Sequence, residues 1–180
     1  MLDTLEFKEL ALADINDNLL DEFNRYQKVT RLWVKTDEGW TLTDGDYTVD
    51  WDKEKKDSLI DFFADLIKEG RGHIFGAYFN KNIAGFAVLM NENFGTRGQY
   101  IQLKFLHVSL DYRHKGIGKK LFELCVKKAR EMGSEKIYIS ANDSEATQQF
   151  YLGLGCKDAE EINQKMADEE PYDRQMEYIV

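Results

Sequence analysis

The chain has few of the residues that mark metal-binding and disulfide-rich proteins. Only two of its 180 residues are cysteine, three are histidine and one is proline. Cys125 and Cys156 form no disulfide framework and lack metal-ligand spacing, and Cys125 lies on the apolar stripe of an expected helix. We therefore expect no metal site. The single proline, Pro171, and the absence of any linker-like segment argue against a division into two domains.

Long apolar runs and an excess of basic residues are also missing. No window approaches the length of a membrane span, and the N-terminal residues 1–6 have neither the basic start nor the apolar stretch of a signal peptide. We expect a cytoplasmic protein without a membrane partner. The formal net charge of −9 argues against sequence-independent binding to nucleic acid and is compatible with a cationic substrate.

The residues that are present suit one globular domain. Apolar residues make up 43% of the chain and aromatic residues 13%, enough to build a core from 180 residues. The chain contains no internal repeat and no low-complexity tract. We expect a single domain over residues 1–180, either a monomer or a homodimer.

Hydrophobic periodicity predicts a mixed α/β order of elements. Extended segments are expected at residues 7–12, 73–79, 83–90, 100–109, 136–141 and 174–180. Helices are expected at residues 15–26, 53–68, 119–132 and 144–152. Residues 80–82, with the sequence Asn-Lys-Asn, predict a hairpin turn, and residues 91–98 a polar loop. Residues 31–51, in which tryptophans alternate with aspartates, are expected to be irregular.

The most informative segment joins the strand at 100–109 to the helix that follows it. Its sequence is Arg-His-Lys-Gly-Ile-Gly, residues 113–118. A strand-to-helix junction presents unpaired N–H groups and the positive end of the helix dipole, and glycine lets an anion approach the backbone. The segment lacks the Gly-Lys-Ser/Thr ending of a nucleotide P-loop and the third glycine of the dinucleotide fingerprint. Taken alone, it is equally compatible with a plain tight turn.

A second motif narrows the interpretation. Asn142 ends the next predicted strand, and a Phe150-Tyr151 pair precedes a Leu-Gly turn. Together with Arg-x-x-Gly-x-Gly at 113–118, in the same order along the chain, this pattern resembles the GNAT superfamily of acyl-CoA N-acyltransferases, most clearly over residues 73–156. The resemblance implies a mostly antiparallel central sheet, flanked by helices and splayed between its fourth strand (100–109) and its fifth (136–141).

The resemblance also implies how acetyl-CoA is bound as co-substrate. Its pantetheine arm would lie in the splay and pair with backbone groups of Leu106, His107 and Val108, and the N–H near Leu106 would stabilise the oxyanion. Asn142 would bind the arm, and Tyr151 would contact the cofactor and protonate the departing thiolate, since a phenol with a pKa near ~10 is protonated at neutral pH. The residues implied at the pyrophosphate are Arg113, His114, Lys115, Gly116, Ile117, Gly118 and Lys119.

The general base does not follow from the motif. Enzymes of this family often carry a glutamate on the fourth strand, where this chain has Gln102 and Lys104. Glutamine accepts no proton at neutral pH, and lysine needs a strongly lowered pKa. Glu92, His107 and a water chain remain as candidates. His73 has no special placement, and His114 is expected to face solvent beside the phosphates.

The function expected from this resemblance is direct transfer of an acetyl group to a primary amine. The aromatic and acidic stretch from Trp33 to Trp51 could form walls and counter-charges for a cationic small-molecule amine, or it could anchor a loop to the core. Two alternatives stay open. One is acetylation of a protein or peptide amine, and the other is a non-catalytic acyl-CoA sensor, which the missing carboxylate favours and Tyr151 disfavours.

Overall fold

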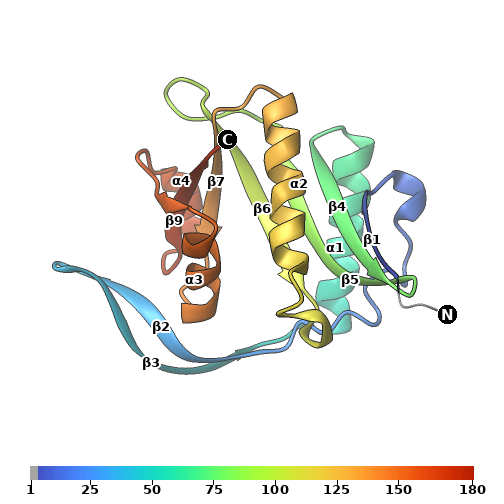
Figure 1. Ribbon diagram of the computed structural model, residues 1–180, viewed down its shortest axis with the longest axis horizontal. Coiled ribbons are helices and arrows are strands. Elements are labelled where there is room, and N and C mark those ends of the chain that lie inside the picture. Colours follow the sequence, from blue (N-terminus) through green and yellow to red (C-terminus); the bar gives the residue numbers. More distant parts are fainter. Residues whose placement is uncertain (1–3) are drawn as a thin grey trace.

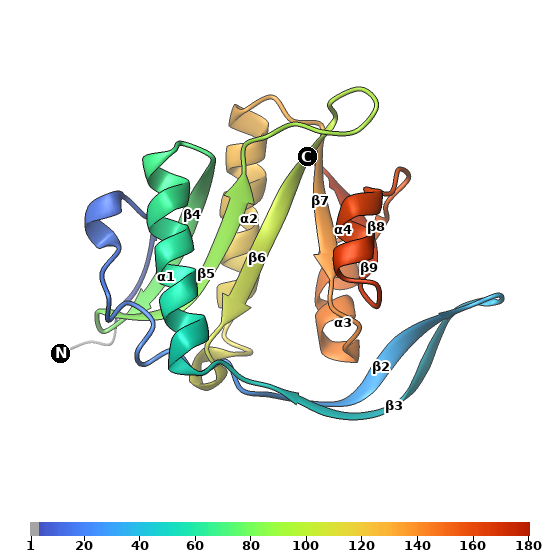
Figure 2. The same cartoon turned by 180° about the vertical axis from the view of Figure 1, so that it is seen from behind.

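The computed structural model describes residues 4–180, so residues 1–3 of the expected domain and of the N-terminal segment lie outside it. A seven-stranded sheet has the order β1-β4-β5-β6-β7-β9-β8, and all neighbours are antiparallel except β6 and β7. Helices cover both faces (Figures 1 and 2). The predicted mixed α/β fold with a mostly antiparallel sheet is confirmed. The strands are β1 (Leu5–Glu9), β4 (Gly72–Phe79), β5 (Asn82–Met90), β6 (Tyr100–Val108), β7 (Lys136–Ala141), β8 (Lys157–Asp158) and β9 (Arg174–Ile179).

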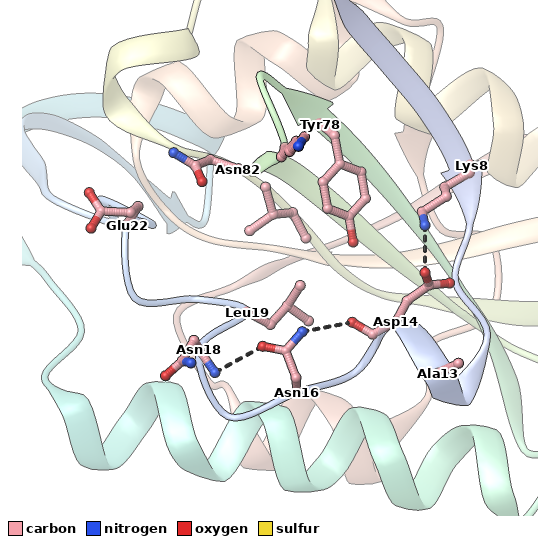
Figure 3. A pocket seen from close by; sticks show the side chains of 11 residues that line it. Lys8, Ala13, Asp14, Asn16, Asn18, Leu19, Glu22, Tyr78 and Asn82 are labelled. Atoms are coloured by element: carbon pink, nitrogen blue, oxygen red, sulfur yellow. Dashed lines mark hydrogen bonds and ion pairs between the residues drawn. The ribbon is translucent and has the colours of Figure 1, made fainter.

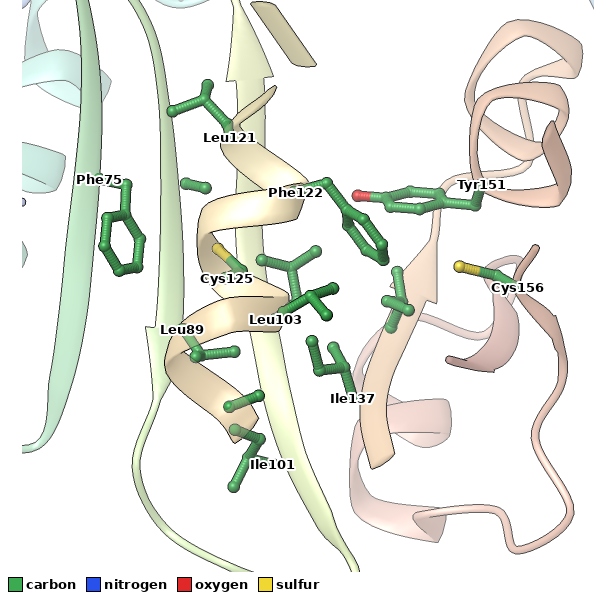
Figure 4. Packing of buried hydrophobic residues seen from close by; sticks show 14 of the residues in the cluster. Phe75, Leu89, Ile101, Leu103, Leu121, Phe122, Cys125, Ile137, Tyr151 and Cys156 are labelled. Carbon is green, nitrogen blue, oxygen red and sulfur yellow. The ribbon is translucent and has the colours of Figure 1, made fainter. Parts of the chain in front are cut away.

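Helices α1 (Lys53–Lys68) and α2 (Ile117–Glu131) pack against opposite faces of the sheet, as Figures 1 and 2 show. Asp52 caps α1 by accepting from the backbone N–H of Lys55 at 2.8 Å. Each helix buries an apolar stripe against the sheet, giving one core cluster on each face (Figure 4 shows the α2 side). The shorter helices are α3 (Glu145–Gly153) and α4 (Gln164–Glu169). Within residues 4–180, no helix is both long and apolar enough to cross a membrane.

The turn between β4 and β5 is confirmed. Asn80 and Lys81 both have positive φ, 49° and 73°, which is the backbone of a two-residue hairpin turn of the type favoured by the twist of the strands. The helix predicted for residues 15–26 is wrong. A 3-10 turn at Leu12–Asp14 is followed by successive turns, because the side chain of Asn16 accepts from the backbone of Asn18 at 3.1 Å and competes with helix formation.

The irregular structure predicted for residues 31–51 is also wrong. The chain there forms a long two-stranded hairpin of β2 (Gln27–Thr36) and β3 (Gly39–Val49), with a register shift between Val29 and Arg31. Threonine, valine and aromatic residues alternate with the aspartates, and this alternation favours strands despite the acidic composition. The first strand also begins earlier than predicted, at Leu5, and α4 and β8 were not predicted.

Strands β6 and β7 diverge along their length. They pair in parallel only over Tyr100–Lys136, Ile101–Ile137 and Gln102–Tyr138. On the other edge, β6 stays paired with β5 as far as Val108, with an irregularity where Lys104 interrupts the register. The predicted splay is therefore present, closed at Tyr100 and open toward Val108 (Figures 1 and 2).

Candidate active site

The open end of the splay exposes one edge of β6. Leu106, His107 and Val108 pair with Ala87, Phe86 and Gly85 of β5, while no described residue of β6 beyond Gln102 pairs with β7. Backbone groups on the β7 side of this segment are therefore left without a strand partner. An extended ligand with amide groups can hydrogen-bond along this edge, as the family resemblance implies for the pantetheine arm.

The turn after β6 presents its backbone outward. Gly116 is the N-cap of α2 with φ 79° and ψ 0°, and His114 also has positive φ, 60°. A side chain at Gly116 would meet nothing within 4 Å, so the space in front of the turn is open. In the described part of the chain, the N–H groups of residues 114–119 have no protein acceptor. Six such donors at the positive end of a fifteen-residue helix form a site for an anion.

Two basic side chains of this turn donate to backbone carbonyls. The Arg113 guanidinium donates from Nε to the carbonyl of Val108 at 3.0 Å and from Nη2 to the carbonyl of Arg25 at 3.2 Å. Lys115 donates to the carbonyl of Asp111 at 3.0 Å. These hydrogen bonds hold the turn, and the role of Arg113 and Lys115 at a phosphate stays a prediction. The side chains of His114 and Lys119 are exposed.

The N-terminus of α2 packs closely on α3. A Cβ placed on Gly118 would lie 3.2 Å from two ring atoms of Phe150, and Ile117 beside it is buried. Gly118 thus allows the helix that carries the anion-binding turn to approach the helix that carries Tyr151. The two predicted motifs therefore meet at the contact of Gly118 with Phe150.

Tyr151 lies in the core cluster between α2, α3 and the sheet. It is 6% exposed, and its ring packs edge-on against Phe122 and Phe150, with centroids 6.3 and 5.1 Å away. Figure 4 shows its hydroxyl pointing from α3 toward α2. Burial raises the pKa of this phenol, so it stays protonated at neutral pH. Among residues 4–180 the hydroxyl has no hydrogen-bond partner, which leaves its proton available to a ligand.

Asn142 follows directly after β7. Its side-chain oxygen accepts from the backbone N–H of Ser144 at 3.0 Å and from the hydroxyl of Tyr47 at 3.4 Å. The amide nitrogen has no partner in the described residues, so a hydrogen bond to the cofactor would come from that group. Tyr47 also donates to the carboxylate of Asp143. It lies in the stretch that was expected to be irregular. Strand periodicity in residues 39–49 was the signal that could have placed it.

The β2–β3 hairpin crosses the open end of the splay, from the N-terminal ends of α1 and α2 past the N-terminal end of α3 (Figures 1 and 2). Its strand β2 is fixed at the far side by the N–H of Trp33, which donates to the carbonyl of Asp143 at 2.8 Å. Gln27 accepts from Arg25 at 2.9 Å and donates to Ser144 at 3.3 Å. Within residues 33–51, Trp51 packs on His107 and Tyr47 bonds to Asn142, so these two residues lie beside the site.

His107 is half-buried among aromatic rings, edge-on to Trp51 with centroids 4.9 Å apart. Burial, together with the positive charges of Arg25, Arg113 and Lys55, lowers its pKa to about 3. His107 is therefore neutral at physiological pH and a very weak base.

One cavity lies away from these residues. It has a volume of about 290 Å³ at the β1–β4 edge of the sheet, and Figure 3 shows Lys8, Asp14 and Tyr78 in its wall. Its polar groups are partly paired with one another, and none of the predicted site residues lines it. Across residues 4–180, no three histidine, cysteine or acidic side chains are grouped as metal ligands.

Comparison with known proteins connects this geometry with one family. The profile of the Acetyltransferase (GNAT) family matches residues 36–155. No curated protein sequence matches the chain.

Three solved structures illustrate the likeness of the fold. A Bacillus anthracis protein assigned as a streptothricin acetyltransferase, solved with acetyl coenzyme A, is 18% identical, with 97% of this chain and 96% of that chain covered and a TM-score of 0.70. The PaiA N-acetyltransferase of Thermoplasma acidophilum, solved with coenzyme A, is 15% identical over 98% and 99%, with a TM-score of 0.61. A ribosomal-protein-alanine N-acetyltransferase of Brucella melitensis is 19% identical over 84% and 90%, with a TM-score of 0.54.

Proposed function

We propose that this chain, which belongs to the GNAT family of acetyltransferases, uses a primary amine on a small cationic molecule as its acceptor. The chain is an acyl-CoA-dependent N-acetyltransferase with acetyl-CoA as co-substrate. What is proposed here is the acceptor class and the role of each residue. The proposal is supported by one observation: six unpaired backbone N–H groups, the free edge of β6 and the buried phenol of Tyr151 all lie at the splay.

The turn at 113–119 binds the pyrophosphate of the donor. Backbone N–H groups are the donors, Gly116 leaves room for the phosphate oxygens, and Arg113 holds the turn in place through Val108. The pantetheine arm follows the free edge of β6 at Leu106, His107 and Val108, with Asn142 on the opposite side.

The transfer needs two groups at the reacting carbon. The N–H near Leu106 donates to the thioester oxygen and stabilises the negative charge that develops there. Tyr151 donates its proton to the departing sulfur. Because burial keeps the phenol protonated, Tyr151 is in the required state over the whole neutral range of pH.

A cationic acceptor is favoured by carboxylates on the β7 side of the site. Asp143 and Asp173 are both half-buried, and neither forms an ion pair with a lysine or arginine of the described chain. A half-buried carboxylate without a counter-ion attracts a cation strongly. The net charge of −9 acts in the same direction at longer range.

The test measures free thiol released from acetyl-CoA across a panel of amines, alongside melting temperature with and without acetyl-CoA. The panel contains aliphatic polyamines, amino sugars, and peptides with a free N-terminus or lysine. We expect stabilisation by acetyl-CoA and fastest turnover with a polyamine or amino sugar. Fastest turnover with peptides would favour protein acetylation instead, and stabilisation with no turnover on any amine would favour a sensor. Absence of any stabilisation would contradict the assigned donor site.

A further inference from the structure

Acetyl transfer requires a proton acceptor for the attacking nitrogen, and the four side chains considered from the sequence do not supply one. Gln102 lies in the closed, paired part of the splay. Lys104 is exposed at the irregularity of β6, and its ammonium lies 5.9 Å from the ring centre of Phe62 on the α1 side. Glu92 is exposed beyond the end of β5, near the closed end of the splay.

His107 is at the open end, but its pKa of about 3 makes it a poor proton acceptor at neutral pH. A useful base has a pKa near the working pH. It also has to lie at the open end of the splay.

Asp173 meets this condition of position. It directly precedes β9, and the pairing of Arg174 with Ala141 places it beside the C-terminal end of β7, next to Asn142. Ser140 and Gln175 face the same side of the sheet as Asp173, opposite the side on which α3 packs. The hydroxyl of Ser140 donates to Asp173 Oδ2 at 3.0 Å, and Gln175 in turn donates to Ser140 at 2.9 Å. This relay fixes the carboxylate at the end of β7.

The charged and titratable groups around Asp173 come from four elements. They are Asp143 after β7, Glu170 after α4, Tyr47 of β3 and Tyr151 of α3. Burial raises the pKa of Asp173 to about 6; the charges of Glu170 and Asp143 act in the same direction, and the Ser140 hydrogen bond opposes them. Burial raises the pKa of the phenols of Tyr47 and Tyr151, and the negative charge of Asp173 acts in the same direction on both.

We propose that Asp173 accepts the proton of the attacking amine, directly or through one water, with Ser140 as its positioning residue. The inference rests on the proposed function, because it assigns the base of that same reaction. Asp143, the other half-buried carboxylate beside Asn142, is instead bound by the hydroxyl of Tyr47.

The step balances with the groups present. The lone pair of the neutral amine forms the new C–N bond as the carbonyl π electrons move to oxygen, and the nitrogen loses one proton to the Asp173 carboxylate. When the carbonyl re-forms, the C–S bond breaks and sulfur takes the proton of Tyr151. Transfer of the proton from Asp173 to the Tyr151 phenolate, through water, restores both residues.

The first test replaces Asp173 with asparagine, which keeps the shape and the capacity to accept from Ser140. We expect kcat on the best amine to fall by about 100-fold, the lower end of the range for general base catalysis, with the KM for acetyl-CoA unchanged. Asp168→Asn, the same change at an exposed position of α4, is the matched control and should retain wild-type kcat. Stabilisation of Asp173→Asn by acetyl-CoA shows that the variant is folded.

The second test uses the pH profile of kcat, which a purely structural role would not shift. Wild-type kcat should fall as pH decreases through about 6, the pKa of Asp173. Ser140→Ala removes a hydrogen bond to the carboxylate and should move this decrease of kcat, the acid limb of the profile, to higher pH. Glu170→Gln removes a like charge and should move it to lower pH. Asp173→Asn should lose the limb.

Three results overturn the assignment while leaving the proposed function intact. They are kcat of Asp173→Asn within threefold of wild type, a raised KM for the amine with kcat unchanged, and a limb that neither Ser140→Ala nor Glu170→Gln moves. The second result would make Asp173 an ammonium-binding group. Wild-type enzyme that turns over no amine contradicts the proposed function itself and this inference with it.

Discussion

The closed end of the splay depends on one buried carboxylate. Glu177 of β9 is fully buried, and its carboxylate accepts from the hydroxyl of Tyr100 and from the ammonium of Lys136 at 2.9 Å. It also accepts from the N–H of Glu160 at 3.1 Å and lies 3.3 Å from the ammonium of Lys157. These contacts join β6, β7, β8 and β9 at the point where β6 and β7 still pair. Glu177→Gln therefore tests what holds the two halves of the sheet together.

The size of the effect follows from these contacts. Breaking a buried ion pair costs about 3–5 kcal/mol, and the lower value applies because Lys136 keeps Glu160 at 2.7 Å. We expect Glu177→Gln to lower the free energy of unfolding by about 3 kcal/mol in urea denaturation. For a chain of this length, that corresponds to a decrease in Tm of roughly 6–12 °C.

The pH dependence gives a second, independent signature. Burial alone would raise the pKa of Glu177, but the hydrogen bonds from Tyr100 and Lys136 outweigh it and lower the pKa below its ordinary value of 4.5. A carboxylate with a lowered pKa stabilises the fold at pH above 4.5 and loses that contribution as pH falls through the lower, folded-state value. The difference between wild type and variant should therefore shrink below about pH 4.5.

A matched control separates this cluster from ordinary surface charge. Glu135 pairs with Arg97 at 3.1 Å, and both side chains are more than half exposed. Glu135→Gln should cost less than about 1 kcal/mol. Equal losses in the two variants, or a loss for Glu177→Gln that stays constant down to pH 3, would refute the reasoning.

Further predictions concern the site itself. Tyr151→Phe should lower kcat by about 100-fold with the KM for acetyl-CoA within threefold, while Tyr178→Phe stays near wild type in the same steady-state assay. Gly118→Val forces a side chain against α3 and should weaken acetyl-CoA binding at least about tenfold by calorimetry, whereas Gly153→Ala, with nothing within 4 Å of its Cβ, should not. Asp173→Asn should stabilise the fold at pH 8 by about 1 kcal/mol, after allowance for partial exposure. Because the folded-state pKa is raised to about 6, this gain in urea denaturation should disappear below pH 4.

Most of the elements on the acetyl-CoA side of the site could be predicted, because the sequence patterns that indicate them are local. The apolar stripe of α2, the glycines before it and the Phe150-Tyr151 pair each lie within one short segment. The helix begins at Ile117 and not at Lys119, because Gly116 adopts a left-handed conformation and ends the turn there. The splay was expected only through the family resemblance that these motifs carry.

The acceptor side depends on contacts between distant segments. Asp173 reaches Ser140 only because β9 inserts beside β7, a pairing that no local pattern of residues 174–180 encodes. The hairpin of β2 and β3 was missed for a different reason. Its aspartates mimic a loop composition, while its stability comes from cross-strand pairing and from Trp33 bound to the carbonyl of Asp143.

The central claim is that the splay and the turn at 113–119 hold acetyl-CoA through backbone N–H groups. Hydrogen–deuterium exchange of the amides, with and without saturating acetyl-CoA, tests it most directly. We predict strong protection by acetyl-CoA at residues 106–108 and 114–119, with little change at the cavity beside Lys8 and Tyr78. Stabilisation of the protein by acetyl-CoA without protection of those two segments would contradict the account.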